Sequence, residues 1–380
     1  MTCDPEVVAG GGGGVTLETR DGEYNDLYVF ELQDPTQVIE WIQDRSVCVA
    51  GYDTKKRNEI LQLSLPPKLC AGVRQGLCPE RDFRVEHGGF SNRPVHQLKH
   101  VSGTRLLVSA GPPDASLLVW RVGAEERDTI ELVSTIHSPE ETWPQIATSC
   151  SLSPRLLHGS QLNNVKIHDV ETQKLLFTLD SALTEPLSGL HLTDSDTFVL
   201  CSARDGCLWL GDWRQRPALA GSSEVPASMG RASRWVMAPG PGPDLSLSPT
   251  ARLSSAGSLV LTDLRDFNKP LSCAEMKLSS HSPNPEHLCV ARAPCSQGCL
   301  SVSGFDGTVH VYESSAWTVA SGEVQPLFVH RGHAVRDCDD EPSAMVTKHV
   351  WHPNRPHTIL SAATDGSFHI WNWVQPSSHS

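Results

Sequence analysis

The sequence predicts an all-β fold, a seven-bladed β-propeller built from repeated units of four strands. Two phrases near the end of the chain share one pattern, SGFDGTVHVYE at 303–313 and ATDGSFHIWN at 363–372. The pattern recurs upstream at the spacing of a propeller blade with variable loops. The last copy lacks a fourth strand, which a segment near the N-terminus can supply. Together these observations predict a closed ring.

Seven anchor positions mark the repeats, each at the place of the aromatic residue that ends a phrase. They are Ser64, Trp120, His168, Gly211, Thr262, Tyr312 and Trp371. Successive anchors lie about 43 to 59 residues apart, against about 40–45 for a blade with short loops. The residues one and three positions before each anchor are all aliphatic or aromatic, the period-two pattern of a buried strand.

A turn is predicted before the anchor strand in four copies. Six residues before the anchor the chain carries an aspartate, whose side chain bonds its own backbone in turns. These residues are Asp114, Asp205, Asp306 and Asp365.

The repeats divide the chain into a propeller and two tails. Residues 1–25 contain five consecutive glycines and predict a flexible tail. The propeller is expected at 26–374 and a short C-terminal tail at 375–380. Within the propeller, 66–100 is expected to be an insertion and 222–246, rich in Pro, Gly and Ser, a mobile loop.

Ring closure is predicted at the two ends of the propeller. The final copy stops at its third strand, whereas Asp26–Asp34 reads as a strand that belongs to no copy. We expect Leu27–Leu32 to pair beside Phe368–Trp373, which removes an open sheet edge.

Composition narrows the function classes. The formal net charge of -13 disfavours nucleic acid, whose phosphates need clustered Lys and Arg. No apolar run approaches the roughly 20 residues that span a bilayer, and the first residues show no secretory signal. Twelve cysteines without such a signal predict reduced thiols in the cytoplasm or nucleus.

One cysteine cluster raises the question of a metal. Cys289, Cys295 and Cys299 lie near His281 and His287, but the spacings do not match a zinc signature. Free cysteine behaves as a small hydrophobic residue, so strand packing is the preferred interpretation. We therefore predict no metal and no cofactor.

The anchors carry a resemblance to a known family. Trp371-Asn372, Tyr312-Glu313 and Trp120-Arg121 stand where the WD40-repeat family has Trp-Asp, and Gly332-His333 supplies its Gly-His once. Over about 27–374 the chain resembles that family, which implies a propeller closed by its N-terminal strand.

The resemblance also implies a structural network. In the last copy Asp365 would orient His333, His333 would reach Ser361, and Ser361 would accept the Trp371 N–H; Asp306 holds the turn of the preceding copy. A His, a Ser and an Asp also suggest nucleophilic catalysis. The structural interpretation is preferred because unpaired buried polar groups cost about 1–3 kcal/mol.

The first insertion is the predicted contact surface for partners. It mixes charge with glycine and aromatic residues, and loops on rigid scaffolds commonly carry binding. A solvated loop that merely tolerates length remains the alternative. Aromatics and Arg dominate interface energetics, so the expected contacts are Arg81, Phe83, Arg84, His87, Phe90 and Arg93. The charged stretch 121–131 is expected to be a solvated turn.

Longer phrases are similar to one branch of the WD-repeat family, among them VIEWI at 38–42, VAGYDTKKRNEIL at 49–61 and FVHRGHAVRD at 328–337. That similarity implies a non-enzymatic scaffold of the cytoplasm and the dividing cell, present at spindle poles and the cleavage furrow and also in the nucleus. The implied partners are the cleavage subunits of the Integrator complex with their assembly partner, and microtubule-associated proteins. The chain would act as a monomer within hetero-complexes.

One other hypothesis stays open. A propeller enzyme or small-molecule binder would use the central channel and would need convergent His, Asp or Glu residues there. The acidic charge makes direct microtubule binding unfavourable, because microtubule surfaces are themselves acidic. We therefore expect any microtubule association to be indirect.

Overall fold

The computed structural model describes the chain at 24–53, 57–66, 83–124, 127–149, 154–227, 229, 232–240, 249–278, 282–320, 322–334 and 344–374. These ranges are all-β, with short 3-10 helices at η2 (Leu162–Asn164) and η4 (Gly332–Ala334). No helix within them has the length and apolar character needed to cross a membrane.

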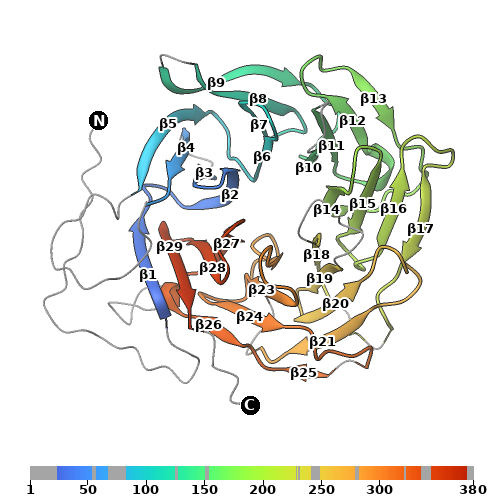
Figure 1. Cartoon of the computed structure of the whole chain (residues 1–380). Helices are drawn as coiled ribbons and strands as arrows, with labels where there is room; N and C mark the ends of the chain where they lie inside the picture. Colours follow the sequence, from blue (N-terminus) through green and yellow to red (C-terminus); the bar gives the residue numbers. More distant parts are fainter. Residues whose placement is uncertain are drawn as a thin grey trace, which may run out of the picture.

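The strands form antiparallel groups of four that stand side by side in a ring (Figure 1). The first two groups are β2 (Thr36–Gln43), β3 (Ser46–Gly51), β4 (Asn58–Ser64) and β5 (Arg84–Ser91), then β6 (Gln97–Val101), β7 (Leu106–Ala110), β8 (Leu117–Ala124) and β9 (Arg127–Ile136). The next two are β10 (Gln145–Thr148), β11 (Arg155–Gly159), β12 (Lys166–Asp169) and β13 (Leu175–Thr178), then β14 (Leu187–Leu192), β15 (Thr197–Ser202), β16 (Leu208–Asp212) and β17 (Leu219–Ser223).

The remaining groups complete the ring. One consists of β18 (Trp235–Ala238), β19 (Thr250–Ser254), β20 (Ser258–Thr262) and β21 (Ser272–Met276), with the short β25 (Glu323–Val324) parallel to β21. Another consists of β22 (Cys289–Arg292), β23 (Cys299–Ser303), β24 (Val309–Glu313) and β26 (Phe328–His330). The last consists of β27 (Val346–Trp351), β28 (Thr358–Ala363), β29 (Ser367–Trp373) and β1 (Tyr24–Glu31).

The predicted closure is confirmed by the pairing of β1 with β29. The register places Leu27 opposite Trp371 and Phe30 opposite Phe368. Beyond the strand, the Leu32 N–H donates to the carbonyl oxygen of Gly366 over 2.8 Å. The closing strand begins at Tyr24, two residues earlier than the sequence predicted.

The hydrophobic core lies between neighbouring sheets. Each anchor lies on the third strand of its group, where the pattern of buried residues was read from the sequence. Leu157 and Ile167 of one sheet pack against Phe198 and Leu200 of the next. The apolar residues that alternate along each strand therefore join the sheets to one another.

Strands lie within the two regions that were expected to be an insertion and a mobile loop. Most of 66–100 that the structure describes is strand, because β5 and β6 lie within it. The region 222–246 contains β18, whose Trp235 is buried. Gly88 and Gly89 interrupt the alternation within β5, and β18 is only four residues long between stretches rich in Pro, Gly and Ser, so neither strand stands out in the sequence pattern. The tails 1–23 and 375–380 lie outside the described residues.

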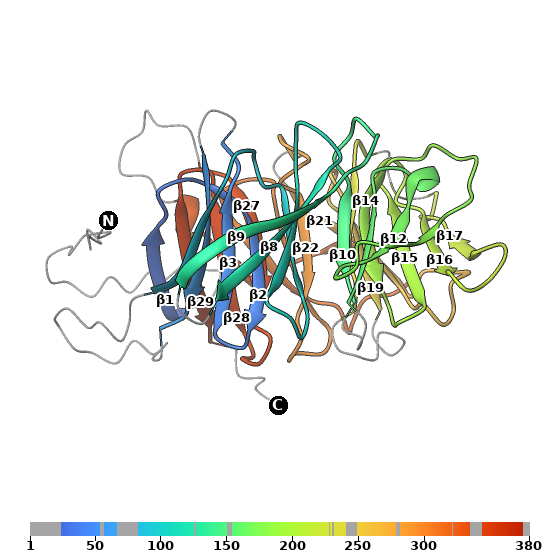
Figure 2. The same ribbon diagram turned by 90° about the horizontal axis from the view of Figure 1, so that it is seen from above.

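The stretch 121–131 also differs from its prediction. Instead of a solvated turn, β8 continues to Ala124 and β9 starts at Arg127. The two strands form a long hairpin that runs obliquely across the molecule (Figure 2). β9 reaches β5 and pairs with it in parallel, at Gly88 opposite Thr129. This pair joins β2–β5 and β6–β9 into one eight-stranded sheet.

Candidate protein-interaction surface

The predicted contact residues follow β5, the outer strand of the first group, and two of them line one pocket. Phe90 is 49% exposed, a high value for so large an apolar side chain. The Arg57 guanidinium lies over its ring, 5.0 Å from the centroid, at cation–π distance. Arg93 lies further along the same wall.

The other predicted contacts have different environments. Phe83 packs edge-on against Phe30 and Phe368, with ring centroids 4.4 and 5.3 Å apart, so it belongs to the core. Arg84 is exposed at the far end of β5, and Arg81 lies outside the described residues. His87 is partly buried and lies 2.8 Å from the Gln62 side-chain oxygen.

Arg93 is engaged within the fold. Its guanidinium donates to Asp114 at 2.8 Å and to the carbonyl oxygen of Ser116, and only 12% of its side chain is exposed. The Ser116 backbone N–H, together with Arg93, lowers the pKa of Asp114. Arg93 therefore stabilises the turn before β8. Because its guanidinium is already bonded within the fold, the geometry does not favour Arg93 as a partner contact.

Two glycines allow β5 to lie close to the hairpin of β8 and β9. A Cβ on Gly89 would clash with the Ile130 carbonyl oxygen. Across the seam, Gly123 adopts φ +50° and a Cβ there would clash with the His87 ring. The His-Gly-Gly-Phe stretch at 87–90 thus serves close strand contact.

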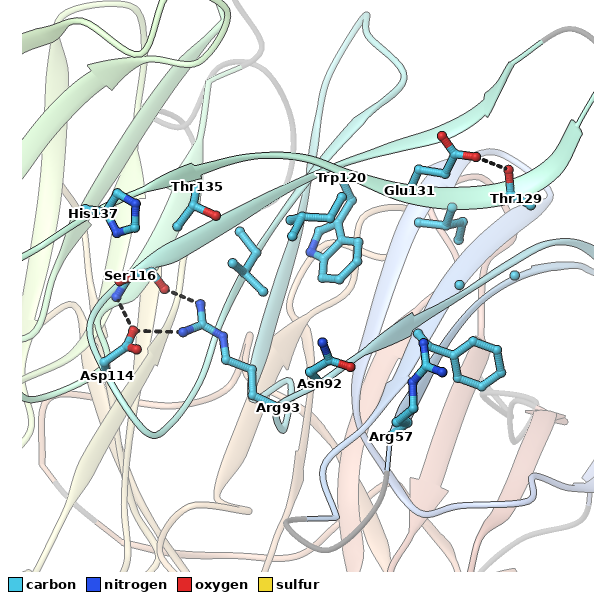
Figure 3. A pocket seen from close by; sticks show the side chains of 16 residues that line it. Arg57, Asn92, Arg93, Asp114, Ser116, Trp120, Thr129, Glu131, Thr135 and His137 are labelled. Carbon is cyan, nitrogen blue, oxygen red and sulfur yellow. Dashed lines mark hydrogen bonds and ion pairs between the residues drawn. The ribbon is translucent and has the colours of Figure 1, made fainter.

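Beyond this contact β5 and β9 border an open pocket of about 710 Å³, which we call the β5–β9 pocket (Figure 3). The β8 residues Leu118 and Trp120 also line it. Its volume lies in the range of ligand-binding pockets, about 300–1,000 Å³. The pocket lining includes Arg57, Phe90, Trp120, Thr129, Ile130 and Leu132.

Two arginines and two carboxylates line the pocket, and they are paired differently. Glu131 accepts a hydrogen bond from the Thr129 hydroxyl at 3.1 Å, and Asp114 is paired with Arg93. Arg57 is exposed, and within the described ranges no carboxylate lies at ion-pair distance from it. The pocket thus presents a cation beside an aromatic wall.

The predicted structural residues form a buried network in the last sheet. The His333 ring nitrogen lies 2.8 Å from the Ser361 hydroxyl, which accepts the Trp371 indole N–H at 3.1 Å. Asp365 does not bond the histidine directly. It accepts the Ser367 hydroxyl at 2.6 Å, and Ser367 lies 2.7 Å from the other His333 ring nitrogen.

Burial sets the electrostatics of this network. It holds the pKa of His333 well below the ordinary histidine value, with a further contribution from His369. Both His333 and Ser361 are almost fully buried. Because both side chains are buried and hydrogen-bonded, the geometry favours structural support.

A group of three buried histidines deserves a test as a metal site. Ligand atoms of His330, His333 and His369 lie within 4.8 Å of one another. However, the His333 and His369 rings stack 3.8 Å apart at 7°, so their in-plane lone pairs run parallel and do not converge. His330 and His369 already share a hydrogen bond at 3.1 Å. The arrangement fits a hydrogen-bonded stack better than metal ligation.

Comparison with known proteins gives the family. No protein-family model matches the sequence. The Integrator complex assembly factor WDR73 of Homo sapiens is 46% identical over 367 residues, covering 92% of this chain and 95% of that protein. The Mus musculus and Xenopus laevis proteins of the same name are 44% and 43% identical over 360 and 353 residues, with the same coverage.

The chain belongs to the WDR73 family. The coverage includes most of the ring, so the relatives match the whole architecture and not one repeat.

Side chains meet across the ring in this member of the WDR73 family. Gln37 of β2 donates to the Glu286 carbonyl oxygen at 3.2 Å, and the Glu286 carboxylate lies 3.9 Å from His96. The His96 ring also lies 5.2 Å from that of Trp143. These residues precede or begin the inner strands β2, β6, β10 and β22. Protein side chains thus bridge sheets that are not neighbours in the ring.

Sequence reasoning missed Arg57 and Leu132 as parts of the pocket. Leu132 is 50% exposed on β9, opposite Trp120 of β8 in the hairpin register. The alternation in DTIELVSTI, at 128–136, was the available signal for a strand. No local signal in the sequence places β9 against β5, because that contact joins two different groups of strands.

Proposed function

We propose that this chain is a non-enzymatic scaffold that helps Integrator subunits to assemble, holding them on a seven-bladed WD40 propeller. The names of its relatives, which are Integrator assembly factors at 43 to 46% identity, carry the proposal. The β5–β9 pocket supports it with exposed apolar surface on a rigid ring, the kind of surface that marks interaction sites.

The number of blades depends on whether the eight-stranded sheet counts as one blade or as two. A single parallel pair joins its halves, β2–β5 and β6–β9, whereas each half has full antiparallel pairing. We count the halves as two blades, which with the other five groups gives seven. The N-terminal strand β1 then completes the seventh blade.

A non-enzymatic role is favoured by where the reactive side chains lie. His333 and Ser361 are buried and hydrogen-bonded to each other. His349 lies 2.7 Å from both Ser301 and Ser303, and all three are buried. The bridging contacts of Glu286 also occupy part of the ring centre, which weighs against the channel-based alternative.

Affinity capture with matched variants tests the scaffold role. The tagged chain is expected to capture Integrator subunits from cell lysate, identified by mass spectrometry. Phe90→Asp with Leu132→Asp should reduce that capture at least about tenfold, because both side chains are exposed walls of the pocket. The control is Leu175→Asp, an equally exposed leucine on β13. Absence of Integrator subunits with the unchanged chain would refute the proposal.

The resemblance extends the proposal to the dividing cell. We place the protein in the cytoplasm and nucleus, and at spindle poles and the cleavage furrow during division, through microtubule-associated partners. The net charge of -13 supports an indirect association with acidic microtubules. Salt-resistant co-sedimentation of the pure chain with pure microtubules would contradict the indirect mode.

A further inference from the structure

We propose that the β5–β9 pocket binds an extended segment of a partner protein. The segment would place a bulky apolar side chain against Trp120 and Ile130 and an acidic side chain beside Arg57. This inference rests on the proposed scaffold function and specifies how one partner is held.

The floor and walls of the β5–β9 pocket favour an apolar side chain in the bound segment. Trp120 and Ile130 are 3% and 4% exposed and form a fixed floor, because they belong to the core between the first two groups of strands. Phe90 of β5 and Leu132 of β9 also line the pocket and are about half exposed. An apolar side chain placed between them removes both from water while resting on an ordered surface.

The charges around the pocket favour the second feature of the segment, an acidic side chain. Arg57 stacks on Phe90 and has no carboxylate within ion-pair distance in the described part of the chain. The neighbouring cation, Arg93, is already neutralised by Asp114. A carboxylate from outside is therefore the complement that Arg57 lacks, and a guanidinium binds it through two parallel hydrogen bonds.

The shape of the site favours an extended segment. Along one edge β9 pairs with β8. Its opposite edge pairs with β5 at Thr129 alone among the described residues, so the rest of that edge is open. An open strand edge accepts an added strand through main-chain hydrogen bonds. A second copy of this chain fits less well, because a twofold contact would bring two concave surfaces together.

The test selects short random peptides displayed on phage against the full chain, with Arg57→Glu as the counter-selection target. Enriched peptides should share an apolar residue and an acidic residue at fixed spacing. Fluorescence anisotropy with the synthesised peptide should show a loss of affinity of at least about tenfold for Arg57→Glu and for Leu132→Asp. Leu175→Asp should bind like the unchanged chain. A peptide with Lys in place of its acidic residue should recover binding to Arg57→Glu.

Three results would overturn the inference. One is the absence of any enriched consensus peptide. A second is a consensus peptide whose affinity is unchanged by Arg57→Glu and by Leu132→Asp. The third is a dimer in sedimentation that Leu132→Asp dissociates, which would assign the pocket to a second copy. If Integrator capture persists in Arg57→Glu and Leu132→Asp, the scaffold function stands and the pocket inference alone fails.

Discussion

At the scale of single residues, four aspartates do the same work in different sheets. Each accepts the backbone N–H of the residue two positions later, at 2.8 to 3.0 Å: Asp114 from Ser116, Asp205 from Cys207, Asp306 from Thr308 and Asp365 from Ser367. The turn between the second and third strands is thus closed by a side chain. This repeated bond explains why aspartate recurs six residues before the anchor.

The bond gives the first stability prediction. Asp365→Ala should lower the free energy of unfolding by about 1–3 kcal/mol, because Ser367 loses partners for its N–H and hydroxyl. Asp306→Ala should have a similar effect through Thr308. Urea denaturation measures both changes, and Asp180→Ala, at an exposed position, is the control. Equal stability of all three variants would show that these turns contribute nothing.

At the scale of elements, the closing strand β1 is the clearest case of a long-range contact. Its partner β29 lies at the other end of the chain, yet the register Leu27–Trp371 aligns apolar faces on both strands. Tyr24 adds a contact to the neighbouring sheet, since its hydroxyl lies 2.7 Å from His330. β1 therefore links two sheets as well as completing one.

Removal of residues 1–32 should open the ring and expose the edge of β29. Open edges template pairing between molecules, so aggregation and a lower melting temperature are expected. Light scattering after gel filtration and thermal melting measure the two effects. The matched control removes residues 1–23 and leaves β1 intact. If both truncated chains stay monomeric with equal melting temperatures, β1 does not close the ring.

The elements also show how much of the fold and of the pocket could be predicted from the sequence. Period-two burial and the recurring aspartates were enough to place the third strands, because both are local patterns. The closure was predicted differently, from the missing fourth strand of the last copy and a strand near the N-terminus that belongs to no copy. β5 was missed because Gly88 and Gly89 break its alternation. Two residues of the pocket, Phe90 and Arg93, were predicted from residue type. Arg57 and Leu132 were not, because the pocket forms where β5 and β9 come together. Such a contact depends on how two groups of strands pack, which neither segment encodes alone.

At the scale of the whole molecule, buried histidines link the sheets and make folding sensitive to acid. Burial is the largest cause of a lowered pKa at His96, His158, His168, His191, His287, His330, His333, His352, His357 and His369. The pKa falls to about 4 at His369 and His191 and to about 3 at His158. The folded state thus binds fewer protons than the unfolded state below neutral pH.

Stability should therefore be complete above about pH 6.5, the ordinary histidine value, and decline as the pH falls toward about 4. Each histidine that stays neutral in the fold contributes a loss of about 1.4 kcal/mol per pH unit in this window. Carboxylates act at lower pH: the Arg214 side chain lowers the pKa of Asp212 to about 2, so its stabilisation is lost below the window.

Urea denaturation at several pH values between 7.5 and 4.5 measures the slope. His369→Gln should reduce that slope relative to the unchanged chain, whereas His137→Gln, at an exposed position, is the control. A free energy of unfolding that stays constant over the window would show that the buried histidines are protonated in the folded state as readily as in the unfolded one.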